Sequence, residues 1–192
     1  MRRKTFDTLI SVAGLLMALV LVAAGGLLTW SYTFVNGQVH DQLASQKIFF
    51  PAADSAAVKG PQFAAMRQYG GQQLTTGAQA ETYANHFIAV HLTEVAGGKT
   101  YSEVSAAAQA DPTNTTLQGQ VNTLFKGTTL RGMLLNAYAF WKMGQIALIA
   151  AFGAFGAAIL MLLLSLLGFR HSRRVPEAVE LLGSRTPAPV EV

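Results

Sequence analysis

Two long stretches without a charged side chain most constrain how this chain can fold. Residues Thr8 to Val39 contain no Asp, Glu, Lys or Arg, and residues Met143 to Phe169 contain none either. Both stretches are apolar almost throughout, and both exceed the roughly 20 residues that a helix needs to cross the hydrocarbon core of a bilayer. The sequence therefore predicts two transmembrane helices, over residues 9–34 and 142–169.

The residues that flank these stretches predict how the two spans are oriented. Basic side chains lie on the outer flanks of the pair, and aromatic side chains lie toward the segment between the spans. Lys and Arg are in excess on cytoplasmic flanks, and aromatic residues gather at membrane interfaces. We therefore expect residues 1–8 and 170–192 in the cytoplasm, the latter as a disordered tail, and residues 35–141 outside. The expected interface anchors are Arg2, Arg3, Lys4, Trp30, Tyr32, Tyr138, Trp141, Arg170, Arg173 and Arg174.

A cleaved signal peptide is the alternative interpretation of the first stretch, because the stretch follows a basic N-terminus and contains Val22-Ala23-Ala24. The apolar region of a signal peptide is usually about 7–15 residues long, and this one is much longer. The sequence therefore favours an uncleaved anchor. Neither span has an ionisable residue at its centre, which disfavours a channel or transporter core.

Small residues recur in both spans and predict close helix packing. Rows of small residues at four-residue steps let helix backbones approach each other in lipid. Such rows serve the packing of the two spans on each other, or on another copy or partner. General abundance of Gly and Ala is the alternative explanation. The candidate packing residues are Gly14, Ala18, Ala150, Gly153, Ala154, Ala157 and Ala158.

Cysteine content and charge exclude several functional classes. The chain has no cysteine, so disulfides, thiolate metal sites, iron–sulfur clusters and a cysteine nucleophile are excluded. The net charge of +4 belongs mostly to the flanks of the spans, and the middle section has no basic stripe. Nucleic-acid binding is therefore not expected. No nucleophile elbow and no paired catalytic carboxylates are found, so no catalytic residue and no cofactor is predicted.

The segment between the spans predicts a small all-α domain. Residues 37–46 continue the first span, and residues 47–51 break it before Pro51. Further helices are expected over residues 63–69, 76–96 and 100–111, the last opened by a capping box at Thr100. Another is expected from Thr115 to Lys126, closed by Gly127, before residues 133–141 lead into the second span. Ile48-Phe49-Phe50 has two interpretations: an exposed contact with a partner or membrane, and burial against the helices.

The one constellation that suggests a metal site is His86, His91 and Glu94. Two imidazoles and a carboxylate suit non-haem iron or zinc. On a regular helix, however, His86 and His91 point about 140° apart. His91 lies in the apolar stripe of its helix and is expected to be a hydrogen-bonded core residue, whereas His86 and His40 are expected at the surface. No metal is therefore predicted.

Four sequence segments together resemble an uncharacterised family of actinobacterial integral membrane proteins with two spans. They are residues 41–51 (DQLASQKIFFP), 83–91 (YANHFIAVH), 97–104 (GGKTYSEV) and 123–140, which begins TLFKG and ends LNAYAF. The resemblance covers residues 9–168 and implies a bacterial plasma membrane but no activity. Similar sequences sometimes carry the label of an aromatic-ring-opening dioxygenase, which the directions of His86 and His91 do not support.

These observations together predict a non-catalytic integral membrane protein. We expect a scaffold or accessory subunit of a plasma-membrane complex, which contacts lipid and either a protein partner or a second copy of itself. Its contact surfaces are the outer helices and the small-residue faces of the spans. The alternative is an extracytoplasmic domain that senses a metal or ligand through His86, His91 and Glu94, anchored by the same two spans.

Overall fold

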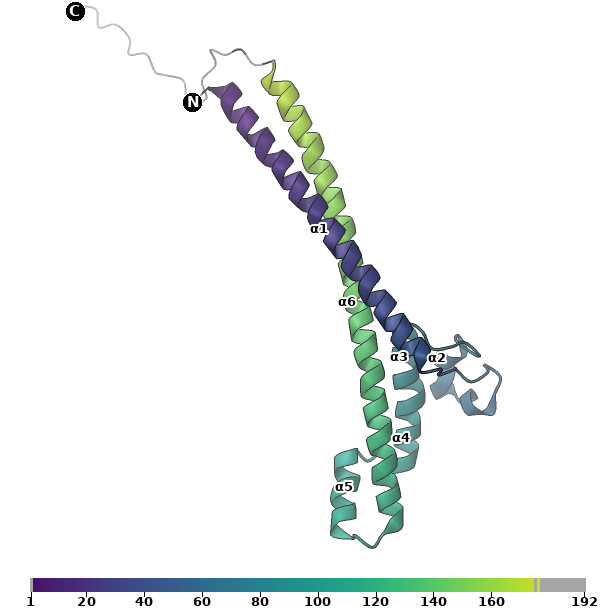
Figure 1. Ribbon diagram of the computed structural model, residues 1–192. Helices are drawn as coiled ribbons and strands as arrows, with labels where there is room; N and C mark the ends of the chain where they lie inside the picture. Colours follow the sequence, from purple (N-terminus) through teal and green to yellow (C-terminus); the bar gives the residue numbers. More distant parts are fainter. Residues whose placement is uncertain (1, 175, 177–192) are drawn as a thin grey trace, which may run out of the picture. The chain divides into compact units, whose positions relative to one another are not determined.

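The computed structural model describes residues 2–174 and residue 176 (Figure 1). These residues form helices and loops without a strand, which confirms the all-α prediction. The remainder of the expected cytoplasmic tail lies outside the described residues. In chain order the elements are α1 (Arg3–Ser45), η1 (Ala56–Val58), η2 (Pro61–Phe63), α2 (Ala64–Arg67), α3 (Gly77–Tyr83), η3 (Ala84–Ile88), α4 (Ala89–Ala96), α5 (Tyr101–Ala110) and α6 (Thr115–Ser172).

The chain divides into two compact units. The terminal unit comprises residues 1–30 and 147–192, and the central unit comprises residues 31–146. The long helices α1 and α6 each contribute residues to both units. By length and composition, both helices are long and apolar enough to cross a membrane. As predicted, α1 continues beyond the apolar stretch to Ser45, and Lys47 follows in the left-handed conformation (φ 53°) that commonly ends a helix.

Helix α6 is longer than the sequence indicates, and the predicted break at Gly127 is wrong. One uninterrupted helix runs from Thr115 to Ser172. Gly127 serves close packing, because a β-carbon at this position would collide with the side chain of Leu92 on α4. The hydroxyl of Thr128 donates to the carbonyl of Leu124, within the same helix, at 2.7 Å. Glycine followed by threonine therefore marks a helix crossing here, not a helix end.

The helix expected over residues 76–96 is present, with one irregular turn. Thr76 and Gln79 form a capping box at its start, and Gly97 ends it with a φ of 57°. Between α3 and α4, the segment η3 is a π-helix of five residues, Ala84–Ile88. Such segments widen a helix locally and occur frequently at functional sites. The sequence pattern contains no signal for it.

The capping box predicted at Thr100 is confirmed. The Glu103 carboxylate accepts hydrogen bonds from the backbone N–H and the hydroxyl of Thr100, at 2.7 and 2.8 Å. These bonds, with a smaller contribution from the charge of Lys99, lower the pKa of Glu103. Helix α5 ends at Ala110, two residues before Pro112, as expected.

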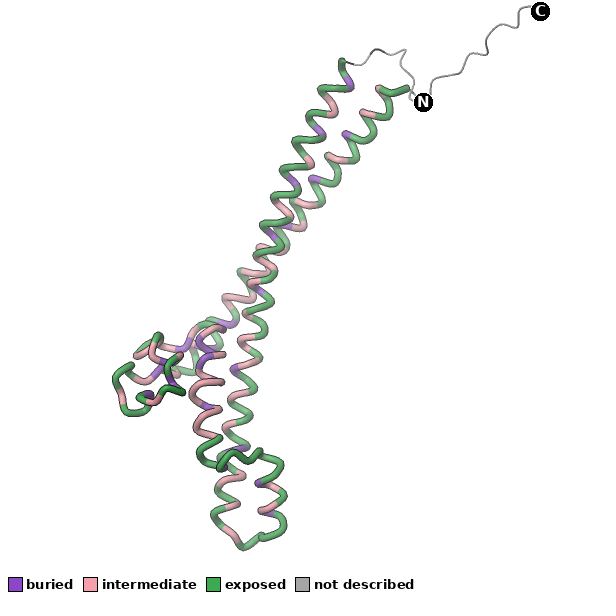
Figure 2. The backbone as a smooth tube through the Cα atoms, turned by 180° about the vertical axis from the view of Figure 1, so that it is seen from behind, coloured by how far each residue is buried: buried purple, intermediate pink, exposed green. Residues whose placement is uncertain are grey.

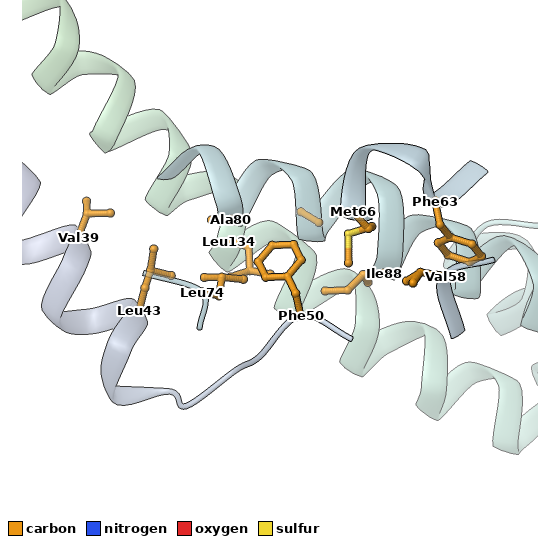
Figure 3. Packing of buried hydrophobic residues seen from close by; sticks show 11 residues of the cluster. Val39, Leu43, Phe50, Val58, Phe63, Met66, Leu74, Ala80, Ile88 and Leu134 are labelled. Atoms are coloured by element: carbon orange, nitrogen blue, oxygen red, sulfur yellow. The ribbon is translucent and has the colours of Figure 1, made fainter. Parts of the chain in front are cut away.

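The main core of the central unit is apolar and joins α1, α2, α3, η3 and α6 (Figure 3), and a smaller cluster of Ala96, Val104 and Leu124 joins α5 to α4 and α6. Phe50 lies near the middle of the main core, with its ring 5.2 Å from that of Tyr69 and 5.3 Å from that of Tyr83, centroid to centroid. Burial raises the pKa of the Tyr83 hydroxyl. The buried members of the main core are Val39, Leu43, Phe50, Val58, Phe63, Met66, Leu74, Ala80, Ala84, Ile88 and Leu134.

The segment Ile48-Phe49-Phe50 confirms the predicted burial at Phe50, whereas Phe49 is exposed. The backbone is extended and pairs with residues 72–74, through Phe50 N–H to Gln72 O and Leu74 N–H to Ile48 O, both at 2.9 Å. Successive side chains of an extended segment point to opposite sides. Phe50 is therefore buried, with 2% of its surface exposed, and Phe49 points outward with 57% exposed.

Candidate functional site: a small-residue seam and an uncharged groove

The buried residues of the terminal unit are all small. Along the described part of this unit, every fully buried residue is Ser, Ala or Gly, and these residues recur every seven positions on each helix. A seven-residue repeat keeps one seam of a helix facing its neighbour. Figure 2 shows the buried positions recurring along the two long helices. They are Ser11, Ala18 and Gly25 on α1, and Ala151, Ala158, Ser165 and Ser172 on α6.

Within this seam, two Ser-x-x-Gly sequences face each other. A β-carbon on Gly14 would collide with the hydroxyl of Ser165, and one on Gly168 would collide with the hydroxyl of Ser11. Each serine thus lies against the glycine of the other helix, and the two helices run antiparallel. Each hydroxyl also donates to its own helix, Ser11 to Asp7 O at 2.7 Å and Ser165 to Met161 O at 2.8 Å. Their hydrogen-bonding protons are therefore satisfied within their own helices.

The structure divides the predicted packing residues into two groups. Ala18 and Ala158 are buried in the seam, and Gly14 and Ala154 are half-buried. Ala150, Gly153 and Ala157 are exposed, so these three take no part in pairing α1 with α6 within the chain. The candidate packing residues did not include the seam residues Ser11, Gly25, Ala151, Ser165 and Ser172, or Gly168 beside the seam. The seven-residue spacing from Ser11 to Gly25 and from Ala151 to Ser172 is the signal that identifies the seam residues.

The predicted interface anchors also differ in their surroundings. Most of the anchors in or next to the terminal unit are exposed, and Lys4 and Tyr32 are half-buried. The exposed ones are Arg2, Arg3, Trp30, Arg170, Arg173 and Arg174.

The two remaining anchors, Tyr138 and Trp141, pack inside the central unit. Tyr138 stacks on Trp141, with ring centroids 6.1 Å apart. Trp141 also covers Gly77, where a β-carbon would collide with the indole side chain. Trp141 therefore fastens the start of α3 to α6, a role that the sequence does not indicate.

The histidines are not assembled into a metal site among the described residues. His91 is half-buried, its Nδ1 lies 2.8 Å from the carbonyl of Phe87, and its ring packs on that of Phe87 at 4.4 Å. This is the environment expected of a core histidine. His86 is half-buried and Glu94 is exposed. No three His, Asp or Glu side chains of the described residues are grouped to hold a metal ion. His40 is exposed beside Asp41.

A polar relay joins α3 and η3 to α6. Arg131 Nη2 donates to Asn85 Oδ1 at 2.8 Å, and Asn85 Nδ2 donates to Glu81 Oε1 at 2.8 Å. Asn85 belongs to the π-helix, so the residue that links the Arg131 guanidinium to the Glu81 carboxylate lies in the irregular turn. All three residues are half-buried. The relay links these helices, and it was not visible in the sequence because Arg131 lies 46 residues from Asn85.

The central unit also contains a groove of about 660 Å³ between α1 and α6. Its floor includes Val39, Leu43 and Leu134, which belong to the apolar core as well. No charged residue lines it. Its polar groups are four exposed carboxamides, whose side chains make no hydrogen bond within the described residues: Gln38, Gln42, Gln46 and Asn136. The regular four-residue spacing of the three glutamines is the sequence signal that was missed.

The seam and the groove share one chemical property. Both are lined by groups that do not titrate near neutral pH, namely apolar side chains, hydroxyls and carboxamides, although carboxamides donate and accept hydrogen bonds readily. Such surfaces suit the packing of helices better than acid–base chemistry. Comparison with known proteins gives no match: no protein family matches the sequence, and no curated protein and no solved structure is similar to the chain.

Proposed function

We propose that the chain is a non-catalytic integral membrane protein that serves as a scaffold or accessory subunit of a plasma-membrane complex. The apolar stretches of α1 and α6 cross the membrane as an antiparallel pair, and both termini lie in the cytoplasm. Residues 35–141 lie outside and present the groove to a partner. Two features of the structure carry the proposal together. In the terminal unit small residues are buried and large apolar residues are exposed, and the central unit has an open, uncharged groove.

The terminal unit supports the membrane assignment because its burial is inverted. In a water-soluble helix pair the large apolar side chains are buried. Here the small residues are buried, whereas Leu19 and Ile149 are 70% and 71% exposed. Leaving so much apolar surface in water costs about 25 cal/mol per Å². In a bilayer the cost disappears, and close packing through small residues is the usual means of pairing helices.

The reciprocal Ser-x-x-Gly contacts support retention of the first span. Ser11 and Gly14 lie in the apolar stretch that a signal peptidase would remove, yet they fit against Gly168 and Ser165. A discarded signal peptide has no need of such complementarity. Removal would also expose the seam of α6.

The groove supports a protein partner, and we assign it to a helix of another membrane subunit. The chain itself provides the precedent, because α3 packs against α6 with small residues: Gly77 against Trp141, and Ala80 and Ala84 in the core. A partner helix of similar kind would cover Val39 and Leu134 and satisfy the four carboxamides. An uncharged groove favours an uncharged helix face, since an unpaired buried charge is strongly unfavourable.

The alternative function, a metal or ligand sensor built on His86, His91 and Glu94, receives no support from the geometry. The imidazole of His91 is already engaged by Phe87 and packs between aromatic rings. Glu94 is exposed and His86 only half-buried.

Photo-crosslinking at matched positions tests the proposed partner site. Phe140 lines the groove and Phe125 does not, and both lie on α6 with 56% of their surface exposed. A photoreactive residue in place of Phe140 is expected to give a crosslinked product of one defined mass in native membranes, and one in place of Phe125 is not. Gln42→Glu, which introduces a charge into the groove, is expected to lower the yield from position 140 more than about tenfold.

Each outcome of this experiment bears on the proposal. A product whose mass is not a multiple of the chain, formed at position 140 and lost with Gln42→Glu, supports a partner subunit. A product of twice the chain mass shows that a second copy of the chain, and not another subunit, occupies the groove, which contradicts the assignment to another subunit. Equal yields from positions 140 and 125, or a yield that Gln42→Glu leaves unchanged, contradict the groove as the docking site.

A further inference from the structure

The terminal unit contains a cavity between α1 and α6 whose lining is largely apolar but includes four polar side chains. It has a volume of about 360 Å³ and lies where the first turns of α1 meet the last turns of α6. A water molecule occupies about 30 Å³ in the liquid, so the cavity has room for a larger group. Its polar side chains are Asp7, Ser11, Ser165 and His171, and its apolar walls include Leu164 and Leu167.

Asp7 is the side chain that most requires a ligand. It is the only acidic residue among residues 2–30 and 147–174. Its Oδ2 atom is buried and has no hydrogen-bond partner among the described residues. A buried acceptor without a partner is costly, and for a charged group the cost is higher. The carboxylate therefore calls for a donor that the described residues do not supply.

The two serines define the kind of ligand further. The protons of Ser11 and Ser165 are already donated to the carbonyls of Asp7 and Met161. Toward the cavity these hydroxyls therefore act as acceptors. The carboxylate and the two acceptor hydroxyls favour a cation with several N–H or O–H donors; the exposed His171, which can donate or accept, lines the same cavity.

The surroundings of the cavity point to a lipid as the source of this cation. The cavity lies where the apolar stretches of both helices end, and its walls of Leu164 and Leu167 are apolar. The exposed guanidinium groups of Arg3, Arg170, Arg173 and Arg174 flank it in the sequence. An ethanolamine phospholipid combines the matching groups, a primary ammonium with three donors and a phosphate that arginine binds well.

We propose that this cavity binds the ammonium headgroup of an ethanolamine phospholipid, with Asp7 as the main acceptor. The proposal rests on the membrane anchoring proposed above. It identifies the cytoplasmic end of the α1–α6 pair as a lipid-binding site, separate from the groove of the central unit.

Reconstituted full-length protein tests this proposal through lipids that differ only in the headgroup. The protein is placed in nanodiscs that contain phosphatidylcholine with equal amounts of phosphatidylethanolamine and phosphatidylglycerol, and retained lipids are identified by native mass spectrometry. We expect phosphatidylethanolamine to be retained preferentially, because choline has no N–H donor. Asp7→Asn is expected to lower its retention about tenfold, the effect of losing one charged hydrogen bond. Asp54→Asn, at an exposed site in the central unit, is the control.

The outcomes separate this proposal from the membrane assignment. Failure of the protein to insert into any nanodisc contradicts the proposed function itself. Insertion with equal retention of the three lipids, or with preference for phosphatidylglycerol, overturns the lipid site alone. If Asp7→Asn does not fold, the unaltered protein still tests the site, because preferential retention of ethanolamine over choline headgroups supports it and equal retention contradicts it. Soluble glycerophosphoethanolamine separates the two sources of the headgroup. If it binds as well as the intact lipid and displaces it, the site recognises the free headgroup and the lipid assignment is contradicted.

Discussion

Phe50→Ala is expected to lower the free energy of unfolding of the central unit by about 3–5 kcal/mol, the usual effect of truncating a buried phenylalanine. Phe50 is 2% exposed and its ring contacts Tyr69 and Tyr83. Alanine would leave a cavity between the loop of residues 48–50 and α3. The loss is large relative to the total stability of a typical domain, about 5–15 kcal/mol.

The adjacent phenylalanine provides a matched control for this prediction. Phe49→Ala removes the same side chain from a position that is 57% exposed, and its effect is expected to be within about 0.5 kcal/mol. Amide hydrogen exchange of residues 74–88 in the reconstituted protein measures both effects, because these residues pack against Phe50. Similar loss of protection in the two variants would show that Phe50 is not a core residue.

Gly14→Leu is expected to separate the two helices of the terminal unit. The added side chain would collide with Ser165, and overpacking of a tight contact costs about 1–3 kcal/mol. The two helices cannot shift to make room, because Gly168 and Ser11 are in equally close contact one step along the seam. The gain in helix propensity from glycine to leucine, about 0.8 kcal/mol, does not offset the collision.

Gly153→Leu is the control for this variant, because it brings the same gain in propensity at a site where a β-carbon meets nothing within 4 Å. The chain has no cysteine, so spin labels can be attached at Thr5→Cys and Arg174→Cys alone. Pulsed electron resonance then gives the distance between the helix ends. We expect a narrow distribution for the unaltered protein and for Gly153→Leu, and a broad or longer one for Gly14→Leu. An unchanged distribution in Gly14→Leu would refute the seam.

Local signals along the chain predicted much of the fold. The apolar stretches marked the long helices, the capping box at Thr100 marked a helix start, and Gly97 marked a helix end. Each depends on interactions within a few residues. Gly127 misled for the same reason, since its contact with Leu92 involves a distant segment. A glycine at a helix crossing and a glycine at a helix end look the same in a sequence.

The candidate site was less accessible to sequence reasoning, because it depends on which helix faces are paired. The sequence analysis identified Ala18 and Ala158 correctly. It also included Ala150, which lies two four-residue steps before Ala158 but is exposed and outside the seam. The groove requires the alignment of Gln42 with Leu134, residues far apart along the chain. The π-helix at Asn85 likewise has no local signature. Only the paired arrangement of the helices reveals these features.

Labelling of single cysteines in intact cells tests whether α1 and α6 cross the membrane with residues 35–141 outside. The absence of native cysteine makes each site unambiguous. A membrane-impermeant maleimide is expected to label Lys99→Cys in intact cells, and to label Thr5→Cys and Ser184→Cys only after the cells are permeabilised. Labelling of Ser184→Cys in intact cells, protection of Lys99→Cys, or loss of the Thr5→Cys site from the mature chain would contradict this topology.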